Sequence, residues 1–216
     1  AKKRDEEIAK IIPMQTFTDS FITHPNDCLK ADKTPYKVFT PYYNNLKFIW
    51  DSYKLEEFET NKNLKLIPFD FDSIPTLENM GFIKQTLPDF LQKNPDELLK
   101  DFEQKIDNYK IDRDFFDKNA TSNLAVHLRF GLISPRQVFN KIKELKARSE
   151  NKEFFIRELF WREFYNYILF HFPKSETSNL NGIKVNWNED ETVFQKWCEG
   201  NTCVPIIYAA MRYFNL

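Results

Sequence analysis

A run of 20 residues, EFFIRELFWREFYNYILFHF (153–172), constrains the fold of this chain more than any other segment. It contains no Gly or Pro, and apolar or aromatic side chains would lie on nearly every side of the helix that it predicts. A helix of this kind has to be buried among other helices, because none of its faces suits contact with water. The segment therefore predicts the central helix of a mainly α-helical domain.

Signals for further helices lie on both sides of this run. The spacing of Leu98, Phe102, Ile106 and Tyr109 predicts one helix from Pro95 to residue 116. Three more helix starts are predicted where a proline occupies the first turn: Thr40-Pro41, Ser134-Pro135 and Pro205. In the first two, the Thr or Ser before the proline is the predicted N-cap.

The first part of the chain has a different pattern. Residues 2–12 predict a short amphipathic helix that Pro13 ends, and residues 14–22 alternate loosely, as a short strand does. A helix and a strand without an earlier strand are typical of the last part of an α/β unit. Residues 24–36 are predicted to form a loop. Residues 56–76 lack a helical period and contain two prolines, so they predict an extended connector.

The composition excludes several classes of protein and site. With 31 Lys and Arg against 32 Asp and Glu, the chain is not a binder whose affinity comes from overall positive charge. Four glycines do not form a glycine-rich phosphate loop, and three scattered cysteines indicate neither a disulfide framework nor a metal site. Because we find no signal peptide and no apolar run of about 20 residues, we expect a cytoplasmic protein without a membrane partner.

Within the central helix, an acid and a base interrupt an aromatic surface. Glu158 and Arg162 are four residues apart and share a stripe with Trp161 and Tyr165. They can be an ordinary ion pair between successive helical turns. Alternatively, one acid and one base among aromatic rings suit a flat ligand with polar edges, such as a nucleobase or a flavin. The spacing alone favours neither interpretation.

A hydroxyl-rich turn, Thr121-Ser122-Asn123-Leu124-Ala125, begins the segment that continues as VHLRFG. Ser, Thr and Asn are preferred at helix N-caps, and a cap is the interpretation that the residue types favour. The alternative is an anion site, because N–H groups and hydroxyls at the start of a helix can bind phosphate without any glycine.

Several segments of the chain follow the motif order of one known family. TSNLAVHLRFGLISPRQVF (121–139) is similar to TSxLSPYLxFGxxSPR, ELFWREFYNYILFHFP (158–173) to ELxWREFYxHxLxxxP, and WCEGNTCVPIIYAAMRYFN (197–215) to WxxGxTGYPxVDAAMRxLN. Upstream, RDEEI and TPYKVFTPYYN are similar to the stretch in which an antenna domain passes into a connector. Through these segments the chain resembles the middle part of the photolyase/cryptochrome family.

The resemblance implies an organisation for the chain. Residues 1–30 would be the remnant of the α/β antenna domain, residues 31–94 the interdomain connector, and residues 95–216 the first part of the helical FAD-binding domain. It also implies light-driven repair of cyclobutane pyrimidine dimers in UV-damaged DNA, with FAD as the cofactor and no metal. An antenna chromophore such as a folate or a deazaflavin would bind in the domain that precedes this chain. One alternative is a cryptochrome-like photoreceptor without lyase activity, and another is a helical interaction module that binds no flavin.

The resemblance assigns roles position by position. Glu158 matches a Glu that hydrogen-bonds the flipped-out dimer, Trp187 matches the surface Trp that ends the electron-transfer chain to the flavin, and Arg113 matches an Arg that contacts DNA phosphate. The positions that match residues at the FAD are Tyr109, Thr121, Ser122, Asn123, Leu124, Ala125, Phe155 and Arg162. The positions that match the DNA side of the same cavity are Arg113, Glu158, Trp161, Arg162 and Tyr165.

The chain also departs from the family pattern. Ala125 and Phe155 stand where the family has Ser and Trp, and Cys203, Val204 and Tyr208 stand where it has Gly, Tyr and Asp. The resemblance stops at Asn215-Leu216, before the family's next motif. We therefore expect a fragment that by itself neither binds FAD tightly nor repairs DNA. The aromatic faces of Phe155, Phe160 and Trp161 would be exposed and would favour its self-association.

Overall fold

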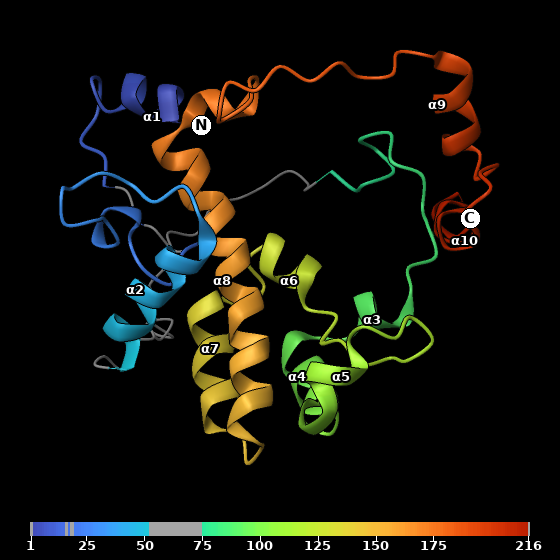
Figure 1. Cartoon of the computed structure of the whole chain (residues 1–216), viewed down its shortest axis with the longest axis horizontal. Helices are drawn as coiled ribbons and strands as arrows, with labels where there is room; N and C mark the ends of the chain where they lie inside the picture. The colour runs from blue at the N-terminus through green and yellow to red at the C-terminus, as the bar shows by residue number, and fades with distance from the viewer. Residues whose placement is uncertain (1, 16, 18–19, 52–74, 216) are drawn as a thin grey trace. The chain divides into compact units, whose positions relative to one another are not determined.

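The computed structural model describes residues 2–15, 17, 20–51 and 75–215, which are coloured in Figure 1. The chain divides into two compact units, Ala1–Pro173 and Lys174–Leu216, and each is described by itself. The α-helices of the first unit are α1 (Lys2–Ile8), α2 (Phe39–Asp51), α3 (Asp89–Gln92), α4 (Pro95–Glu103), α5 (Tyr109–Asp112), α6 (Ala125–Arg129), α7 (Pro135–Glu144) and α8 (Ser149–His171). The second unit contains α9 (Glu191–Cys198) and α10 (Pro205–Phe214). The 3₁₀ turns are η1 (Pro25–Asp27), η2 (Ile106–Asn108) and η3 (Pro173–Glu176).

The mainly α-helical class is confirmed, since the described residues contain helices and no strand. The helix predicted over residues 2–12 is found as the shorter α1. The strand predicted over residues 14–22 is wrong for the part of it that the structure describes, where no second strand offers a ladder of hydrogen bonds. The predicted connector, 56–76, lies outside the described residues except for its last two. The division at residues 30 and 94 stays a prediction.

The predicted central helix is confirmed as α8, which begins four residues before the aromatic run and ends at His171. It packs against α2, α5 and α7, and Figure 1 shows α7 running alongside it. Its buried apolar side chains come from several sides of the helix: Phe155, Leu159, Phe160, Phe164 and Tyr167. Burying one large apolar side chain contributes about 1.5–3 kcal/mol, so α8 supplies much of the core of the first unit.

The predicted helix starts are found with one correction. Ser134 caps α7 in a capping box, in which its hydroxyl accepts from the N–H of Gln137 (3.1 Å) and the Gln137 side chain accepts from the N–H of Ser134 (3.0 Å). α10 begins at Pro205, as predicted. α2 instead begins at Phe39, so Thr40 lies inside its first turn. The Phe39 ring stacks on Trp161 of α8 with 3.6 Å between the centroids, a tertiary contact that capping signals do not contain.

The single helix predicted from Pro95 to residue 116 is wrong, because α4, η2 and α5 follow one another there. Asn151 of α8 explains the break. Its side-chain oxygen accepts from the N–H of Lys110 (2.9 Å), and its NH₂ group donates to the carbonyl of Asp107 (2.6 Å). Backbone groups at the break thus find partners on α8, and a continuous helix is not needed to satisfy them. The predicted apolar positions are still buried: Leu98, Phe102, Ile106 and Tyr109.

Glu163 of α8 binds the backbone of the segment that precedes η1. Its carboxylate accepts hydrogen bonds from the N–H of Ile22 (2.8 Å) and from the N–H and hydroxyl of Thr23 (2.9 and 3.0 Å). Arg136 of α7 donates to the carbonyl of the same Ile22 (3.0 Å). The side chains of two helices therefore replace the strand partner that this segment lacks.

Two more side chains of α8, at four-residue spacing after Glu163, also bind backbone groups of the first part of the chain. The hydroxyl of Tyr167 donates to the carbonyl of Cys28 (2.8 Å) and accepts from the N–H of Tyr36 (2.9 Å). His171 bonds through Nε2 to the carbonyl of Pro25 (3.1 Å). Together with Glu163, they explain how a loop poor in apolar residues is held against the core.

Because Glu163 is buried, its contribution to the free energy of unfolding depends on pH. Burial raises the pKa of its carboxyl from 4.5 to about 7, although the hydrogen bonds from Thr23 and Ile22 and the nearby Arg162 lower it. Below pH 4.5 the group is protonated in both states. Between pH 4.5 and 7 the unfolded chain loses the proton first, so the contribution of Glu163 to stability falls as the pH rises. We expect the free energy of unfolding of wild type, minus that of Glu163→Gln, to fall from pH 4.5 to pH 8 in urea titrations. A value that stays constant or rises with pH would contradict the raised pKa.

The second unit is built from α9 and α10, which pack on each other. Gly200 between them has φ +70°, and a Cβ at this position would lie 3.3 Å from the carbonyl oxygen of Tyr208. The side-chain amide of Asn215 donates to the carbonyl of Cys198 (2.8 Å), and the Arg212 guanidinium lies 3.9 Å from the centroid of the Tyr208 ring. The glycine turn and the hydrogen bond from Asn215 thus connect the two helices, while the contact of Arg212 with Tyr208 lies within α10.

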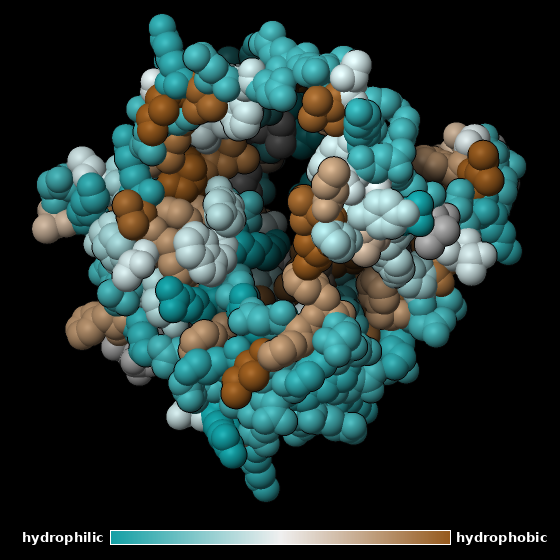
Figure 2. All heavy atoms as spheres, turned by 45° about the vertical axis from the view of Figure 1, so that its right-hand side comes forward, coloured by the Kyte–Doolittle hydropathy of each residue, from teal (hydrophilic) through white to brown (hydrophobic). Residues whose placement is uncertain are grey.

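Large hydrophobic side chains also lie on the surface, where Figure 2 shows them in brown between hydrophilic residues in teal. In the first unit they include Phe115, Phe116, Phe130 and Leu132, with exposed fractions between 50% and 87%. Of the rings on which the predicted self-association rests, Phe155 and Phe160 are buried in the first unit. Self-association itself stays a prediction.

Candidate functional site

Four of the predicted site residues form one cluster where α5 meets α8, here called the Glu158 cluster: Tyr109, Arg113, Phe155 and Glu158. The buried rings of Tyr109 and Phe155 lie edge to face with 5.4 Å between centroids, and both contact Phe102 of α4. Nη1 of Arg113 donates to Oε1 of Glu158 (2.6 Å), and its guanidinium lies 5.6 Å from the Tyr109 ring. The sequence separates Arg113 from Glu158 by 45 positions, and the fold brings them together.

The environment of this cluster fixes its charges. The hydrogen bond that Arg113 donates to Glu158 raises the pKa of the Arg113 guanidinium above its ordinary value, so this group is a permanent cation. Burial raises the pKa of the Tyr109 hydroxyl, which stays protonated and available as a hydrogen-bond donor at neutral pH. The ion pair is partly exposed, with 28% of the Arg113 side chain and 39% of the Glu158 side chain accessible, so its net contribution to stability is about 0–1 kcal/mol.

Glu158 retains hydrogen-bonding capacity for a ligand. Only Oε1 of its carboxylate is bonded among the described residues, and Oε2 accepts no hydrogen bond from them. A carboxylate accepts several hydrogen bonds, and this one lies beside the cation of Arg113. It can therefore receive the N–H edge of a flat ligand without giving up its contact with Arg113.

The ordinary ion pair between Glu158 and Arg162, one of the two interpretations of their spacing, is not found. Arg162 instead donates to the carbonyls of Ser20 (2.9 Å) and Leu128 (3.5 Å), and burial lowers the pKa of its guanidinium. In this structure Arg162 connects α8 to the segment before η1 and to the end of α6. Its role at FAD or DNA stays a prediction.

Trp161 and Tyr165 lie on the same helix as Glu158. The Trp161 ring is partly buried between Phe39 of α2 (3.6 Å) and Tyr165 (5.8 Å), both stacked, and Phe164 meets it at an edge (6.0 Å). Tyr165 is 65% exposed. An exposed ring supported by a stacked one is suited to stacking on a base. The order Glu158, Trp161, Tyr165 along α8 places that ring two turns from the carboxylate.

The hydroxyl-rich turn lines a different feature, a pocket of about 460 Å³, here called the Thr121 pocket. Its walls are residues 89, 90 and 93 at α3, residues 98, 101 and 105 at α4 and just after it, and residues 119 and 121–123. Thr121, Ser122 and Asn123 contribute two hydroxyls and an amide to this pocket, while Leu124 is buried and Ala125 begins α6. Hydroxyls, an amide and lysines are the donors that a phosphate group requires.

The N-cap interpretation of this turn is not confirmed. The residue at the N-cap of α6 is Leu124, and no side chain caps this helix. Asn123 has φ +56°, in the left-handed region, and is followed by Leu124 in the right-handed helical region. Alternation of these two conformations points successive N–H groups to one side, the arrangement known as an anion-binding nest. The positive φ of Asn123 explains why the turn does not form the extended cap that its residue types suggested.

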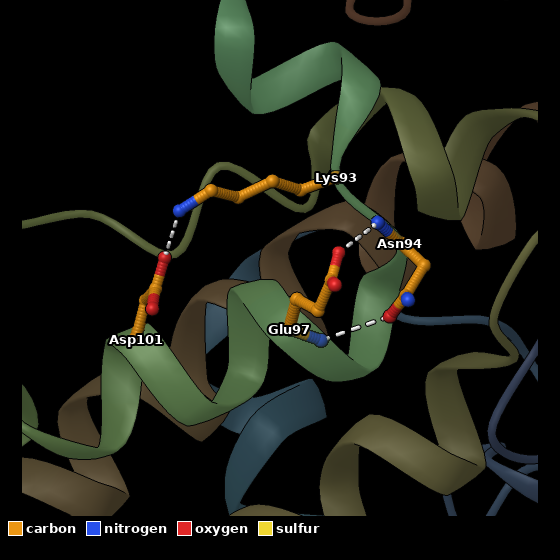
Figure 3. A network of polar contacts seen from close by, with 4 residues as sticks. All are labelled: Lys93, Asn94, Glu97 and Asp101. Carbon is orange, nitrogen blue, oxygen red and sulfur yellow. Dashed lines mark hydrogen bonds and ion pairs between the residues drawn. The ribbon is translucent and has the colours of Figure 1, made fainter.

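Sequence reasoning missed the ion pair of Lys93 and Asp101, two residues that line this pocket; Figure 3 shows the pair. Nζ of Lys93 lies 2.6 Å from Oδ2 of Asp101, and next to it Asn94 and Glu97 form a capping box at the start of α4. The pattern Asn-x-x-Glu before an apolar run is a recognised helix start and could have located this turn. The hydrogen bond from His127 to the carbonyl of Lys93 (2.9 Å) left no signal in the sequence.

Trp187, the predicted end of the electron-transfer chain, belongs to the second unit and is 78% exposed.

Within the described ranges no group of three His, Cys, Asp or Glu side chains is arranged to hold a metal ion. None of the helices in those ranges has the length and apolar character needed to cross a bilayer.

Comparison with known proteins gives one consistent result. Residues 155–216 match the family described as the FAD binding domain of DNA photolyase. The chain is 32% identical to a deoxyribodipyrimidine photo-lyase of Alkalihalophilus pseudofirmus over 93% of the chain and 43% of that relative. It is 29% identical to the mitochondrial deoxyribodipyrimidine photo-lyase of Saccharomyces cerevisiae over 93% of the chain and 40% of that relative.

A solved structure agrees with these relatives. The crystal structure of a bacterial class III photolyase from Agrobacterium tumefaciens superposes with a TM-score of 0.80 and 28% identity, covering 98% of this chain and 46% of that protein. The chain thus spans less than half the length of the relatives named here. Its sequence motifs, its helical fold and its relatives agree, and the chain belongs to the DNA photolyase family.

Proposed function

We propose that this chain carries part of the FAD site and the dimer-contacting surface of a light-driven DNA repair enzyme that reverses cyclobutane pyrimidine dimers. The observation that carries the proposal is the Glu158 cluster. A carboxylate with one oxygen unbonded among the described residues lies beside a permanent cation, in a cluster that contains two buried rings, at the position where the family motif has its dimer-contacting Glu. The deoxyribodipyrimidine photo-lyases among the relatives support the same substrate.

The Thr121 pocket fits the diphosphate of FAD. Its hydroxyls, its amide and its two lysines are donors. The turn at Asn123 and Leu124 has the backbone conformations of an anion-binding nest, and in this structure the N–H of Leu124 bonds to Oγ of Ser122 (3.5 Å). Tyr109 and Phe155 would lie near the flavin, as the family alignment implies. When bound, reduced FAD excited by light supplies the electron that splits the dimer. The antenna chromophore implied by the family, a folate or a deazaflavin, is assigned to no residue of this chain.

The DNA would be held by charge and by stacking. Photolyases act on a nucleotide taken out of the base stack, so the protein has to hold both the flipped dimer and the neighbouring backbone. Arg113 would contact a phosphate, and Trp161, Arg162 and Tyr165 would line the side of the cavity that faces the DNA. In the second unit, exposed Trp187 would end the path along which the flavin is photoreduced.

The test replaces Glu158 in a protein of photolyase length that contains this chain. We expect Glu158→Ala to lower the yield of dimers repaired per photon absorbed about 3- to 10-fold, since one hydrogen bond to a polar ligand contributes about 0.5–1.5 kcal/mol. Bound FAD, measured by its visible absorption, should be unchanged. Glu153→Ala, at an exposed acid of the same helix, is the matched control and should leave the yield unchanged.

Each other outcome has a defined meaning. Undiminished repair by Glu158→Ala would remove Glu158 from the reaction. Wild-type protein that binds flavin and repairs no dimers would favour the cryptochrome-like photoreceptor. Absence of flavin from the wild-type protein would contradict the FAD site itself.

A further inference from the structure

The Thr121 pocket contains a charged pair that neither the family motifs nor the fold requires. Lys93 and Lys105 bring two positive charges to this pocket, and Asp89 and Asp101 bring two negative charges. The nearby turn supplies neutral hydroxyl and amide donors. A diphosphate carries negative charge, so its binding in this pocket depends on how the lysines are divided between the ligand and the two aspartates.

The backbone of Lys93 is fixed relative to the hydroxyl-rich turn. His127 belongs to α6, the helix that directly follows that turn, and its Nε2 bonds to the carbonyl of Lys93 (2.9 Å). A carbonyl only accepts, so Nε2 carries the proton in this bond. The His127 side chain is 2% exposed, and its Nδ1 has no partner among the described residues, which leaves the bond to Lys93 as its polar anchor. His127 is therefore a positioning residue for the pocket wall.

The next residue fixes the other side of Lys93. Asn94 and Glu97 bond to each other's backbone N–H groups (2.9 Å each), which holds the turn that enters α4. His127 holds the carbonyl of Lys93, and Glu97 holds the next residue, Asn94. The backbone from which the Lys93 side chain extends therefore has a defined position at the pocket. Its ammonium then reaches Asp101, about two turns along the sequence from Lys93.

The ion pair between Lys93 and Asp101 is easy to exchange. The two side chains are 45% and 46% exposed, and a pair of such exposure contributes little net stability. The charge of Lys105 also acts on Asp101, where it helps to lower the pKa of that carboxyl. If Lys93 turned to another anion, Asp101 would still have a cation nearby.

We propose that Lys93 is a cationic contact for the diphosphate of FAD, and that Asp101 competes with that diphosphate for Lys93. The identity of the ligand rests on the proposed function. The phosphate chemistry rests on the residues that line the pocket: two lysines, with two aspartates beside them, and the hydroxyl and amide donors of the turn. Asp101 has the opposite effect to Lys93, because its removal frees the ammonium for the ligand.

The experiment titrates this chain with inorganic pyrophosphate, FAD and riboflavin, observed by NMR at the backbone amides of residues 119–123. We expect Lys93→Met to weaken pyrophosphate and FAD about tenfold, as loss of a charge-assisted hydrogen bond does. Asp101→Asn should tighten both about threefold, and added salt should reduce both differences. Riboflavin, which has no phosphate, should respond to neither substitution.

The matched controls lie on α4, the helix that carries Asp101, and outside the Thr121 pocket. Lys100→Met and Glu103→Gln change the same charges on residues that line a different groove, and should change affinity less than about twofold. Melting temperatures check that each variant is folded, which the exposure of Lys93 and Asp101 favours. An effect of Lys93→Met no larger than that of Lys100→Met would overturn the proposal. So would pyrophosphate that leaves these amides unchanged, or an Asp101→Asn variant that binds more weakly.

Failure of this inference is distinguishable from failure of the proposed function. FAD binding that is indifferent to Lys93→Met overturns the role of Lys93 and leaves the flavin site intact. Pyrophosphate binding that depends on Lys93, together with a photolyase-length protein that binds no FAD, contradicts the flavin function and leaves a phosphate site of another purpose.

Discussion

Replacing Glu163 with leucine is expected to lower the free energy of unfolding by about 3–5 kcal/mol, because each donor that loses its buried acceptor costs about 1–3 kcal/mol. Glu163 is 1% exposed and accepts three hydrogen bonds, from the N–H groups of Ile22 and Thr23 and the hydroxyl of Thr23. Leucine fills a similar volume but leaves all three donors without a partner in a buried site. The measurement is urea unfolding followed by circular dichroism.

Hydrogen exchange gives this prediction a local readout. The amides of Ile22 and Thr23 should exchange faster in Glu163→Leu, because they lose the bonds that protect them. Glu153→Leu is the control on the same helix, since half of that acid side chain is exposed, and it should change stability by about 1 kcal/mol or less. A cost below 1 kcal/mol for Glu163→Leu, or unchanged exchange at both amides, would show that α8 does not hold this segment through its carboxylate.

Replacing Phe102 with alanine is expected to cost about 3–5 kcal/mol, the range for large-to-small substitutions of a buried aromatic ring. Phe102 is fully buried in α4, with its ring 4.6 Å from Phe155 and 5.4 Å from Tyr109 between centroids. The cavity left by alanine lies next to the rings of Tyr109 and Phe155, which belong to the Glu158 cluster. The variant should therefore lose stability and also disturb the geometry of the candidate site.

Two comparisons separate packing from other effects. Phe102→Leu keeps most of the volume and should cost less than about 1.5 kcal/mol. Phe116→Ala removes a ring that is 87% exposed and should change stability by about 0.5 kcal/mol or less. If Phe102→Ala were no more costly than Phe116→Ala, the described core around α4 and α8 would be wrong.

The local signals of the sequence were reliable where a structure depends on neighbouring residues. Ser134-Pro135 predicted the start of α7, and the capping box with Gln137 confirms it. The aromatic run predicted a central helix, and α8 is buried on several sides as expected. The family motifs, which are also local patterns, led to the photolyase fold that the solved relative confirms.

Local sequence patterns did not predict which charged side chains pair in the structure. Glu158 has Arg162 at the spacing of a helical ion pair, yet its partner is Arg113, 45 positions away. An isolated pair at four-residue spacing is worth about 0.2–0.5 kcal/mol, so better partners elsewhere easily replace it. Arg162 finds two carbonyls, one of them 142 positions away.

The sequence by itself determined the helical class, the central helix and the family, because these depend on residue types at short, regular spacing. Only the tertiary structure decided that α4, η2 and α5 replace one helix, and that Glu163 holds residues 22 and 23 where a strand was predicted. It also placed Lys93, Asp101 and the hydroxyl-rich turn around one pocket. The physical reason is that buried backbone groups take whichever partner the packed chain presents. Such partners, up to 146 positions apart, leave no periodic trace in the sequence.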